Sequence, residues 1–204
     1  MTTAVVLLSG GKDSAVALWW AKAHHESVHA VSISHPERPR MELAAAGRLA
    51  GLAECELIEF DLPFLRSARM LIPGREDDVD TAGAYVPMRN LLIFSVAGYC
   101  AELVHANSIV AGQLASDGRA YSDATEDFFQ EMVEIFRTSL SRSFLTKVGE
   151  LSIELPLIRL SDAEAIRLGR ELDVPFEATW SCLQDGQEPC LTCVSCRDRA
   201  RVLP

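Results

Sequence analysis

The feature that most constrains the fold is a glycine pair placed between a strand pattern and a helix pattern. Ala4 to Leu8 form an unbroken apolar run, Ser9-Gly10-Gly11 follows at once, and Ser14 to Ala23 has a helical composition. This order predicts a buried strand, a tight turn and a helix. A second β-rich run, Val28 to Ile33, completes a βαβ unit whose strands are parallel and buried on both faces. We therefore expect an α/β fold with a doubly wound, mostly parallel sheet.

The alternation of helix and strand patterns continues along the chain. Helices are expected over Met41–Leu52, Asn90–His105, Asp123–Leu140 and Ser161–Leu172, and strands over Glu56–Phe60, Ser108–Ala111 and Leu151–Leu157. Ser161 and Glu164 have the spacing of a capping box. Prolines, glycines and acidic residues between Leu62 and Ala84 predict a long mobile loop. We divide the chain into an α/β domain, residues 1–174, and a cysteine-rich tail, residues 175–204.

Composition limits the classes of protein. The chain has 204 residues, of which 49% are hydrophobic, so it can bury the core of one domain and disorder is excluded as its main state. Its 29 acidic and 19 basic residues give a net charge of −10, which disfavours nucleic acid as a partner. Apolar runs stay well below the roughly 18 residues of a membrane span, and Met1-Thr2-Thr3 lacks the basic flank of a signal peptide. We expect a cytoplasmic protein.

The turn between the first strand and the first helix has the chemistry of an anion site. Gly10 and Gly11 let backbone N–H groups approach a phosphate, and the helix N-terminus adds a partial positive charge. Lys12 adds a full positive charge, while Ser9 and Ser14 add hydroxyl donors. The spacing differs from both the P-loop and the dinucleotide-binding fingerprint. The segment is therefore predicted to bind phosphate, but with a loop motif that differs from these two.

Ser9-Gly10-Gly11-Lys12-Asp13-Ser14 resembles the PP-loop, Ser-Gly-Gly-x-Asp-Ser, of the ATP pyrophosphatase superfamily. The resemblance implies that ATP is split into AMP and pyrophosphate while a substrate is adenylated. The implied ATP-binding residues are Leu8, Ser9, Gly10, Gly11, Lys12, Asp13 and Ser14, of which the last three are candidate catalytic residues. Because a carboxylate repels pyrophosphate, Asp13 indicates a bridging Mg²⁺. In the alternative interpretation, the glycines only form a turn and Asp13 caps the helix.

Four cysteines gather near the C-terminus: Cys182, Cys190, Cys193 and Cys196. Their Cys-x7-Cys-x2-Cys-x2-Cys spacing favours one metal ion, and four thiolates suit a structural, tetrahedral Zn²⁺. An Fe–S cluster and a disulfide pair are the alternatives, the latter disfavoured in the cytosol.

Further motifs lie in the middle and at the end of the chain. Together with the PP-loop, the segments Tyr85-Val86-Pro87-Met88-Arg89-Asn90, Thr179-Trp180-Ser181-Cys182 and Pro189-Cys190-Leu191-Thr192-Cys193-Val194-Ser195-Cys196 resemble the 7-cyano-7-deazaguanine synthase (QueC) family over nearly the whole chain. The resemblance implies an ATP-dependent carbon–nitrogen ligase of queuosine biosynthesis. Such an enzyme converts 7-carboxy-7-deazaguanine and ammonia to the nitrile through an amide, and the family implies a homodimer.

Two segments depart from the family pattern. Tyr121-Ser122-Asp123-Ala124-Thr125 stands where the family has Tyr-Pro-Asp-Cys-Arg, and Glu37-Arg38-Pro39 stands where it has Gln-Arg-His. The ATP chemistry is unaffected by either departure. The alternative that this chain is a paralogue acting on another carboxylate or amine therefore stays open.

Four residues are candidates for binding the deazaguanine substrate. Asp123 can accept from two adjacent N–H groups of the base, although it can equally cap the helix that follows, and Glu126 is the alternative. Arg89 can pair with a carboxylate or a phosphate, whereas Asn90 can contact the substrate or cap the helix that it begins. Trp180 offers a flat face for stacking, or packs in the core.

Two other functions compete with the ligase. A tRNA-modifying PP-loop enzyme shares the motif and cysteine pairs, but such an enzyme is expected to carry a basic stripe or an RNA-binding domain. A non-catalytic nucleotide sensor would keep the loop without turnover. Tight tRNA binding would indicate the first, and ATP binding without AMP production the second.

Overall fold

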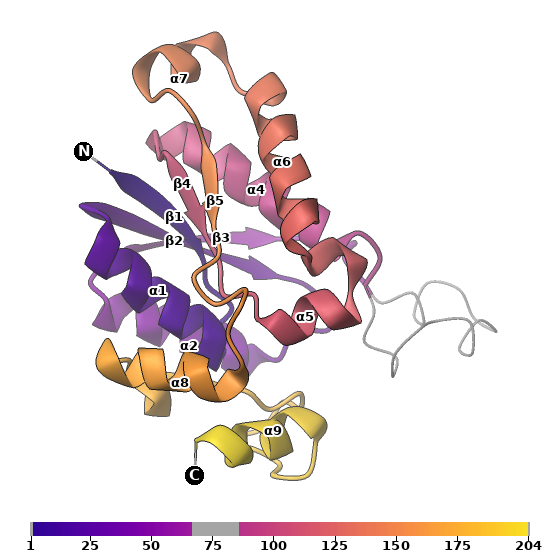
Figure 1. The fold of residues 1–204 in the computed structure, drawn as a ribbon. Coiled ribbons are helices and arrows are strands. Elements are labelled where there is room, and N and C mark those ends of the chain that lie inside the picture. Colours follow the sequence, from indigo (N-terminus) through magenta and orange to yellow (C-terminus); the bar gives the residue numbers. More distant parts are fainter. Residues whose placement is uncertain (1, 67–85, 204) are drawn as a thin grey trace, which may run out of the picture.

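A parallel sheet of five strands forms the centre of the molecule in the computed structural model, which describes residues 2–66 and 86–203 (Figure 1). The strands are β1 (Thr3–Leu7), β2 (Ser27–Ser34), β3 (Glu56–Asp61), β4 (Ser108–Val110) and β5 (Ser152–Glu154), in the spatial order β3-β2-β1-β4-β5. All four pairings are parallel, as the βαβ pattern predicts. Tyr85 and most of the predicted loop from Leu62 to Ala84 lie outside the described residues.

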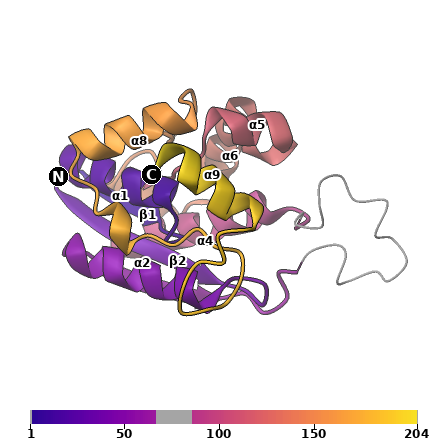
Figure 2. The same ribbon diagram turned by 90° about the horizontal axis from the view of Figure 1, so that it is seen from below.

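Helices cover both faces of this sheet (Figures 1 and 2). The buried cluster on one face includes α1 (Lys12–His24), α2 (Arg40–Leu52) and α8 (Asp162–Glu171). The cluster on the other face includes α4 (Arg89–Val104), α6 (Glu126–Ser139) and α7 (Arg142–Lys147). The expected doubly wound α/β fold is thereby confirmed.

Strand β1 shows why the apolar runs are continuous. Ala4 and Val6 pack into the cluster of α1 and α2, whereas Val5 packs into the cluster of α4, and all three are fully buried. Successive side chains of a strand point to opposite faces, so a strand covered on both sides has only apolar positions.

The predicted helix over Asp123–Leu140 begins later than expected. Residues Ser122–Ala124 form a short 3₁₀ turn, Thr125 is extended, and α6 starts at Glu126. The Thr125 side chain accepts from the Phe128 backbone N–H and thus caps the helix, a role that the sequence analysis considered for Asp123.

Other boundaries also differ from expectation. The strand predicted over Leu151–Leu157 is paired only from Ser152 to Glu154. Two helices of six residues, α5 (Ala115–Ala120) and α7, were not predicted, because so short a segment carries little periodicity. The capping box is confirmed, since Ser161 and Glu164 bond reciprocally at the start of α8. Within the described ranges, every helix is too short or too polar to cross a bilayer.

The C-terminal tail packs below the sheet and ends in α9 (Val194–Val202), next to α8 (Figures 1 and 2). Arg199 of α9 ties it to the preceding 3₁₀ turn, Phe176–Ala178. Its guanidinium donates to the Phe176 carbonyl at 2.7 Å, to Thr179 Oγ1 at 2.7 Å and to Ser181 Oγ at 3.2 Å. The four cysteines of the tail are therefore held against the body of the fold.

Candidate active site and metal centre

A cavity of about 480 Å³ opens where β1, β2 and β4 end at their carboxyl edge. The strand order reverses between β1 and β4, and in open α/β sheets such a switch point is where ligands bind. The loop residues Leu8, Ser9, Gly11, Asp13 and Ser14 line this cavity. Arg89 and Asn90 of α4 line the cavity as well.

The loop is held in shape by its own hydroxyl groups. Ser14 Oγ accepts from the Ser9 backbone N–H at 3.2 Å and donates to the Gly11 carbonyl at 3.0 Å. Ser9 Oγ lies 3.0 Å from Ser14 Oγ and accepts from the Gly11 N–H at 3.1 Å. The N-cap of α1 is Gly11, which has no side chain to accept a hydrogen bond, so Asp13 is not the capping residue. The N-terminus of α1 is thus exposed toward the cavity with its partial positive charge.

Two glycines allow this loop to touch its neighbours. Gly10 has a φ of +96°, and a Cβ there would lie 2.2 Å from the Glu42 carbonyl oxygen. Gly112 follows β4, and a Cβ on it would lie 2.5 Å from the Asp13 carbonyl oxygen. The first contact seats the loop on α2 and the second seats it on the end of β4. Sequence analysis identified Gly10 but missed Gly112, whose role depends on a contact far along the chain.

Lys12 is buried beneath the loop and is absent from the cavity lining. Its Nζ lies 2.9 Å from both carboxylate oxygens of Asp13 and 2.7 Å from Asp162 Oδ1. Burial lowers the pKa of Lys12, but the two carboxylates outweigh it, and the pKa is raised above its ordinary value. The ammonium is therefore charged and doubly paired. Asp162 was not expected from the sequence.

Three further residues of the cavity lining each have a polar atom without a partner among the described residues. Buried atoms of His35 (Nδ1), Arg38 (Nε) and Gln113 (Oε1) lack a hydrogen bond to any described residue, and all three side chains line the cavity. Buried polar atoms are normally paired, so residues with unpaired ones that line a cavity are candidates for contact with a polar ligand. Burial, together with Arg38 and Arg89, lowers the pKa of His35, which favours the neutral imidazole. These residues follow β2 and β4, and sequence analysis singled out only Arg38 among them, as part of a departure from the family pattern.

Arg38 lines the cavity and also forms hydrogen bonds that connect the neighbouring segments. Its guanidinium donates to Ser32 Oγ at 3.0 Å and to the carbonyl oxygens of Ile33 and Ser9. Glu42 lies nearby, and burial raises its pKa although Arg38 and a hydrogen bond with Ser9 oppose the change. The loop, β2 and α2 thus meet at one polar cluster.

Asp123 and Trp180 occupy positions behind the cavity. The Asp123 carboxylate accepts from the Asn90 backbone N–H at 3.3 Å, and its carbonyl accepts from Asn90 Nδ2 at 2.8 Å. The Trp180 backbone N–H donates to the Gly10 carbonyl at 2.9 Å, while its indole N–H donates to the Cys182 carbonyl. Neither side chain lines the cavity. Asp123 thus contacts Asn90, which lines the cavity, whereas Trp180 contacts Gly10, which lies between the lining residues Ser9 and Gly11.

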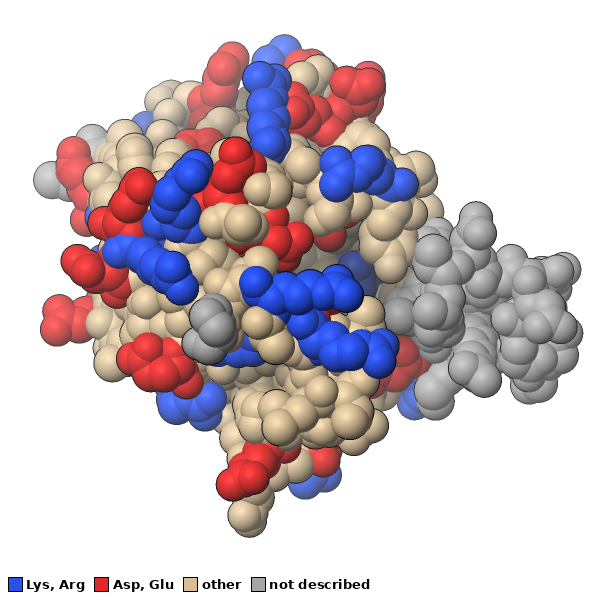
Figure 3. Space-filling model, turned by 60° about the horizontal axis from the view of Figure 1, so that its bottom comes forward, with Lys and Arg blue, Asp and Glu red and all other residues tan. Residues whose placement is uncertain are grey.

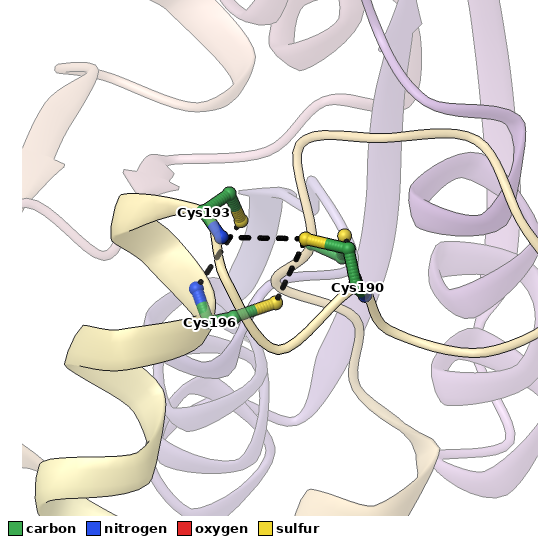
Figure 4. A group of neighbouring side chains, drawn as sticks. Cys190, Cys193 and Cys196 are labelled. Carbon is green, nitrogen blue, oxygen red and sulfur yellow. Dashed lines mark hydrogen bonds between the residues drawn. The ribbon is translucent and has the colours of Figure 1, made fainter.

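The four tail cysteines lie close together, and Figure 4 shows three of them, Cys190, Cys193 and Cys196. All four sulfur atoms lie within 4.8 Å of one another, and Cys190 Sγ is 4.0 Å from Cys196 Sγ. A single ion with bonds of about 2.3 Å holds four thiolates roughly 3.8 Å apart at the corners of a tetrahedron. No disulfide joins any of the six cysteines of the chain. The donor set therefore fits a metal ion.

Backbone N–H groups surround these sulfur atoms. Gln184 and Cys190 donate to Cys182 Sγ, Cys193 donates to Cys190 Sγ, and Cys196 donates to Cys193 Sγ. Hydrogen bonds, that of the Thr192 hydroxyl foremost, lower the pKa of Cys190 to about 6, whereas burial raises the pKa of Cys196 to about 12. N–H groups aimed at sulfur stabilise thiolates, which are the form that binds metal.

Comparison with solved structures shows that other proteins share this fold. The chain is similar to a 4-thiouridine synthetase solved as an RNA complex with bound ATP, with a TM-score of 0.57, 17% identity, and coverage of 94% of this chain and 45% of that one. It is also similar to the U34-tRNA thiolase NcsA from Methanococcus maripaludis, with a TM-score of 0.51, 14% identity, and coverage of 97% and 63%. At such identities the likeness concerns the fold alone.

The family is defined by sequence. The model of the family "Queuosine biosynthesis protein QueC" matches residues 3–204. The 7-cyano-7-deazaguanine synthase of Trichodesmium erythraeum is 35% identical, covering 96% of this chain and 93% of the relative, and that of Thermosynechococcus vestitus is 37% identical, covering 96% and 88%. The chain belongs to the QueC family, as its motifs imply, and is an enzyme of the carbon–nitrogen ligase class.

Proposed function

We propose that the chain is an ATP-dependent ligase that adenylates the carboxylate of 7-carboxy-7-deazaguanine and uses ammonia to form 7-cyano-7-deazaguanine. One observation carries the proposal. The cavity at the switch point is lined by the anion-binding loop and by His35, Arg38 and Gln113, each of which has a buried polar atom without a hydrogen bond to any described residue. The loop suits the phosphates of a nucleotide, and the other three side chains suit a polar heterocycle.

The loop residues from Leu8 to Ser14 bind ATP in this proposal. The Gly11 turn and the N-terminus of α1 face the leaving pyrophosphate, and such preorganised dipoles stabilise charge that develops on a leaving group. Asp13 lines the cavity and is the carboxylate to which Mg²⁺ would bind. When bound, Mg²⁺ neutralises charge on phosphate oxygens.

The reaction needs no protein nucleophile. The substrate carboxylate attacks the α-phosphorus of ATP, pyrophosphate leaves, and an acyl-adenylate forms. Ammonia displaces AMP to give an amide. A second ATP adenylates the amide oxygen, and loss of AMP and a proton yields the nitrile. The chain's task is to hold these groups in line and to exclude water.

Arg89 and Asn90 are the proposed substrate contacts. Arg89 lines the cavity and can pair with the substrate carboxylate in bidentate fashion. Asn90 also lines it, and its amide is oriented by the Asp123 carbonyl. Asp123 and Trp180 thus act by positioning Asn90 and Gly10.

The tail cysteines are proposed to hold a structural Zn²⁺. The spacing of the four sulfur atoms supports a single ion over a larger iron–sulfur cluster. Trp180 connects this centre to the loop, because it bonds to Gly10 and precedes Cys182 by two residues.

Acidic and basic side chains are interspersed on the face that carries the tail (Figure 3). This distribution supports a small-molecule acceptor over an RNA substrate. The family also suggests a homodimer, which light scattering after size-exclusion chromatography would test.

The decisive experiment incubates the protein with ATP, Mg²⁺, ammonium and 7-carboxy-7-deazaguanine, with mass spectrometry of the products. The nitrile, AMP and pyrophosphate are expected. Asp13→Asn should lower pyrophosphate release by about a hundredfold or more, whereas Asp127→Asn, on the exposed first turn of α6, is the matched control. AMP production with a different acceptor would indicate a paralogue, and ATP binding without AMP would contradict the proposal.

A further inference from the structure

The cation of the loop is turned away from the cavity it is expected to serve. Lys12 is the one basic residue between Leu8 and Ser14, yet its ammonium lies between Asp13 and Asp162 and only a tenth of its side chain is exposed. A bound pyrophosphate must therefore compete with two carboxylates for this ammonium.

Asp162 reaches Lys12 because α8 lies very close to α1. Gly169 of α8 faces Val16 of α1, and a Cβ on Gly169 would lie 2.8 Å from Val16 Cγ2. Ser161 and Glu164 cap α8 and fix Asp162 as its first residue. The carboxylate is placed by tertiary packing, 150 positions from its partner in sequence.

The two carboxylates differ in what they can do. Asp13 is adjacent to Lys12 and lines the cavity, whereas Asp162 is absent from the cavity lining, and 43% of its side chain is exposed. Asp162 thus contacts Lys12 without a place in the proposed nucleotide site.

We infer that Asp162 is a positioning residue that holds Lys12 Nζ away from the cavity and thereby weakens the binding of pyrophosphate. A carboxylate that competes with pyrophosphate for the ammonium favours release of this product, which would otherwise be bound tightly by the loop. The inference rests on the proposed function, since it assigns pyrophosphate to the loop.

The test measures binding of inorganic pyrophosphate with Mg²⁺ to the full chain by isothermal titration calorimetry. Asp162→Asn removes the charge at nearly constant volume, and we expect it to tighten binding about two- to fivefold, the range of a partly exposed ion pair. Asp127→Asn makes the same change in the first turn of another helix and should leave the affinity unchanged. Equal or weaker binding by Asp162→Asn would overturn the inference.

A second measurement separates the ion pair from a general charge effect. In a Lys12→Met background, Asp162→Asn should no longer tighten binding, and a persisting gain would mean that bulk charge alone acts. Should Lys12→Met not fold, competitive acetylation read by mass spectrometry supplies the same information without it. Asp162→Asn should make Lys12 react with the acetylating reagent several times faster, with exposed Lys22 and Lys147 as references. An unchanged rate of acetylation would refute the claim that Asp162 holds the Lys12 ammonium.

These results also separate the inference from the proposed function. If wild-type protein binds neither pyrophosphate nor ATP, the proposed function fails, while acetylation still tests whether Asp162 holds the Lys12 ammonium. If wild type and Asp162→Asn bind pyrophosphate equally, only the inference fails.

Discussion

Gly10→Ala is expected to destabilise the protein by about 3 kcal/mol, which the structure allows to be worked from two contributions. The backbone at Gly10 has a φ of +96°, where an L-residue pays roughly 1–2 kcal/mol. The new Cβ would lie 2.2 Å from the Glu42 carbonyl oxygen and 2.8 Å from the Ala46 nitrogen. Both are backbone atoms, so α2 or the loop must move, and overpacking of this kind costs roughly 1–3 kcal/mol.

The assay is urea unfolding together with differential scanning calorimetry. A loss of about 3 kcal/mol lowers the Tm by roughly 10 °C in a chain of this length. The matched control is Gly47→Ala in the middle of α2, where a Cβ meets nothing within 4 Å. That change should raise stability by about 0.5–1 kcal/mol through helix propensity.

A Gly10→Ala protein as stable as wild type would refute the close seating of the loop on α2. An equal loss of stability in Gly47→Ala would show that any alanine at a glycine position near α2 is destabilising, so the loss in Gly10→Ala could not be assigned to its contact with α2. If the loop moves to relieve the contact, ATP binding should fall together with stability.

Three further predictions concern the tail and the buried carboxylate. Arg199→Met should cost about 2–3 kcal/mol by leaving buried acceptors unpaired, whereas Met at the exposed neighbour Arg197 should change urea stability little. Cys193→Ser, or a strong chelator, should release one equivalent of metal and lower the Tm, as elemental analysis and calorimetry would reveal, and retained metal would contradict the ligand set. Burial raises the pKa of Glu42 above 4.5, so its contribution to stability is complete below pH 4.5 and is lost as pH rises through the folded-state pKa. Glu42→Gln should therefore become more stable relative to wild type as the pH rises, as urea unfolding at several pH values would show. Curves of stability against pH that run parallel for the two proteins would contradict a raised pKa of Glu42.

The sequence alone identified those parts of the site whose residues are neighbours along the chain. The phosphate loop lies within seven consecutive residues, and its strand, turn and helix patterns agree, so local chemistry sufficed to predict both its place and its ligand. Three of the four cysteines lie within seven residues at metal-ligand spacing, and the same reasoning applies to them. The order of strands and helices also followed from periodicity and glycine turns, apart from the short helices α5, α7 and α9.

Tertiary structure alone decided which distant residues meet the loop. Nothing near Gly112, Gln113 or His35 marks them as cavity residues, because they become neighbours only when parallel strands place their carboxyl ends side by side. Asp162 pairs with Lys12 only because Gly169 lets α8 approach α1. For Asp123 the sequence left ligand contact and helix capping open, and only the tertiary structure shows that it bonds to Asn90 at the start of α4. Periodicity predicts which face of an element is buried, but the partner across that face depends on how the elements pack in three dimensions.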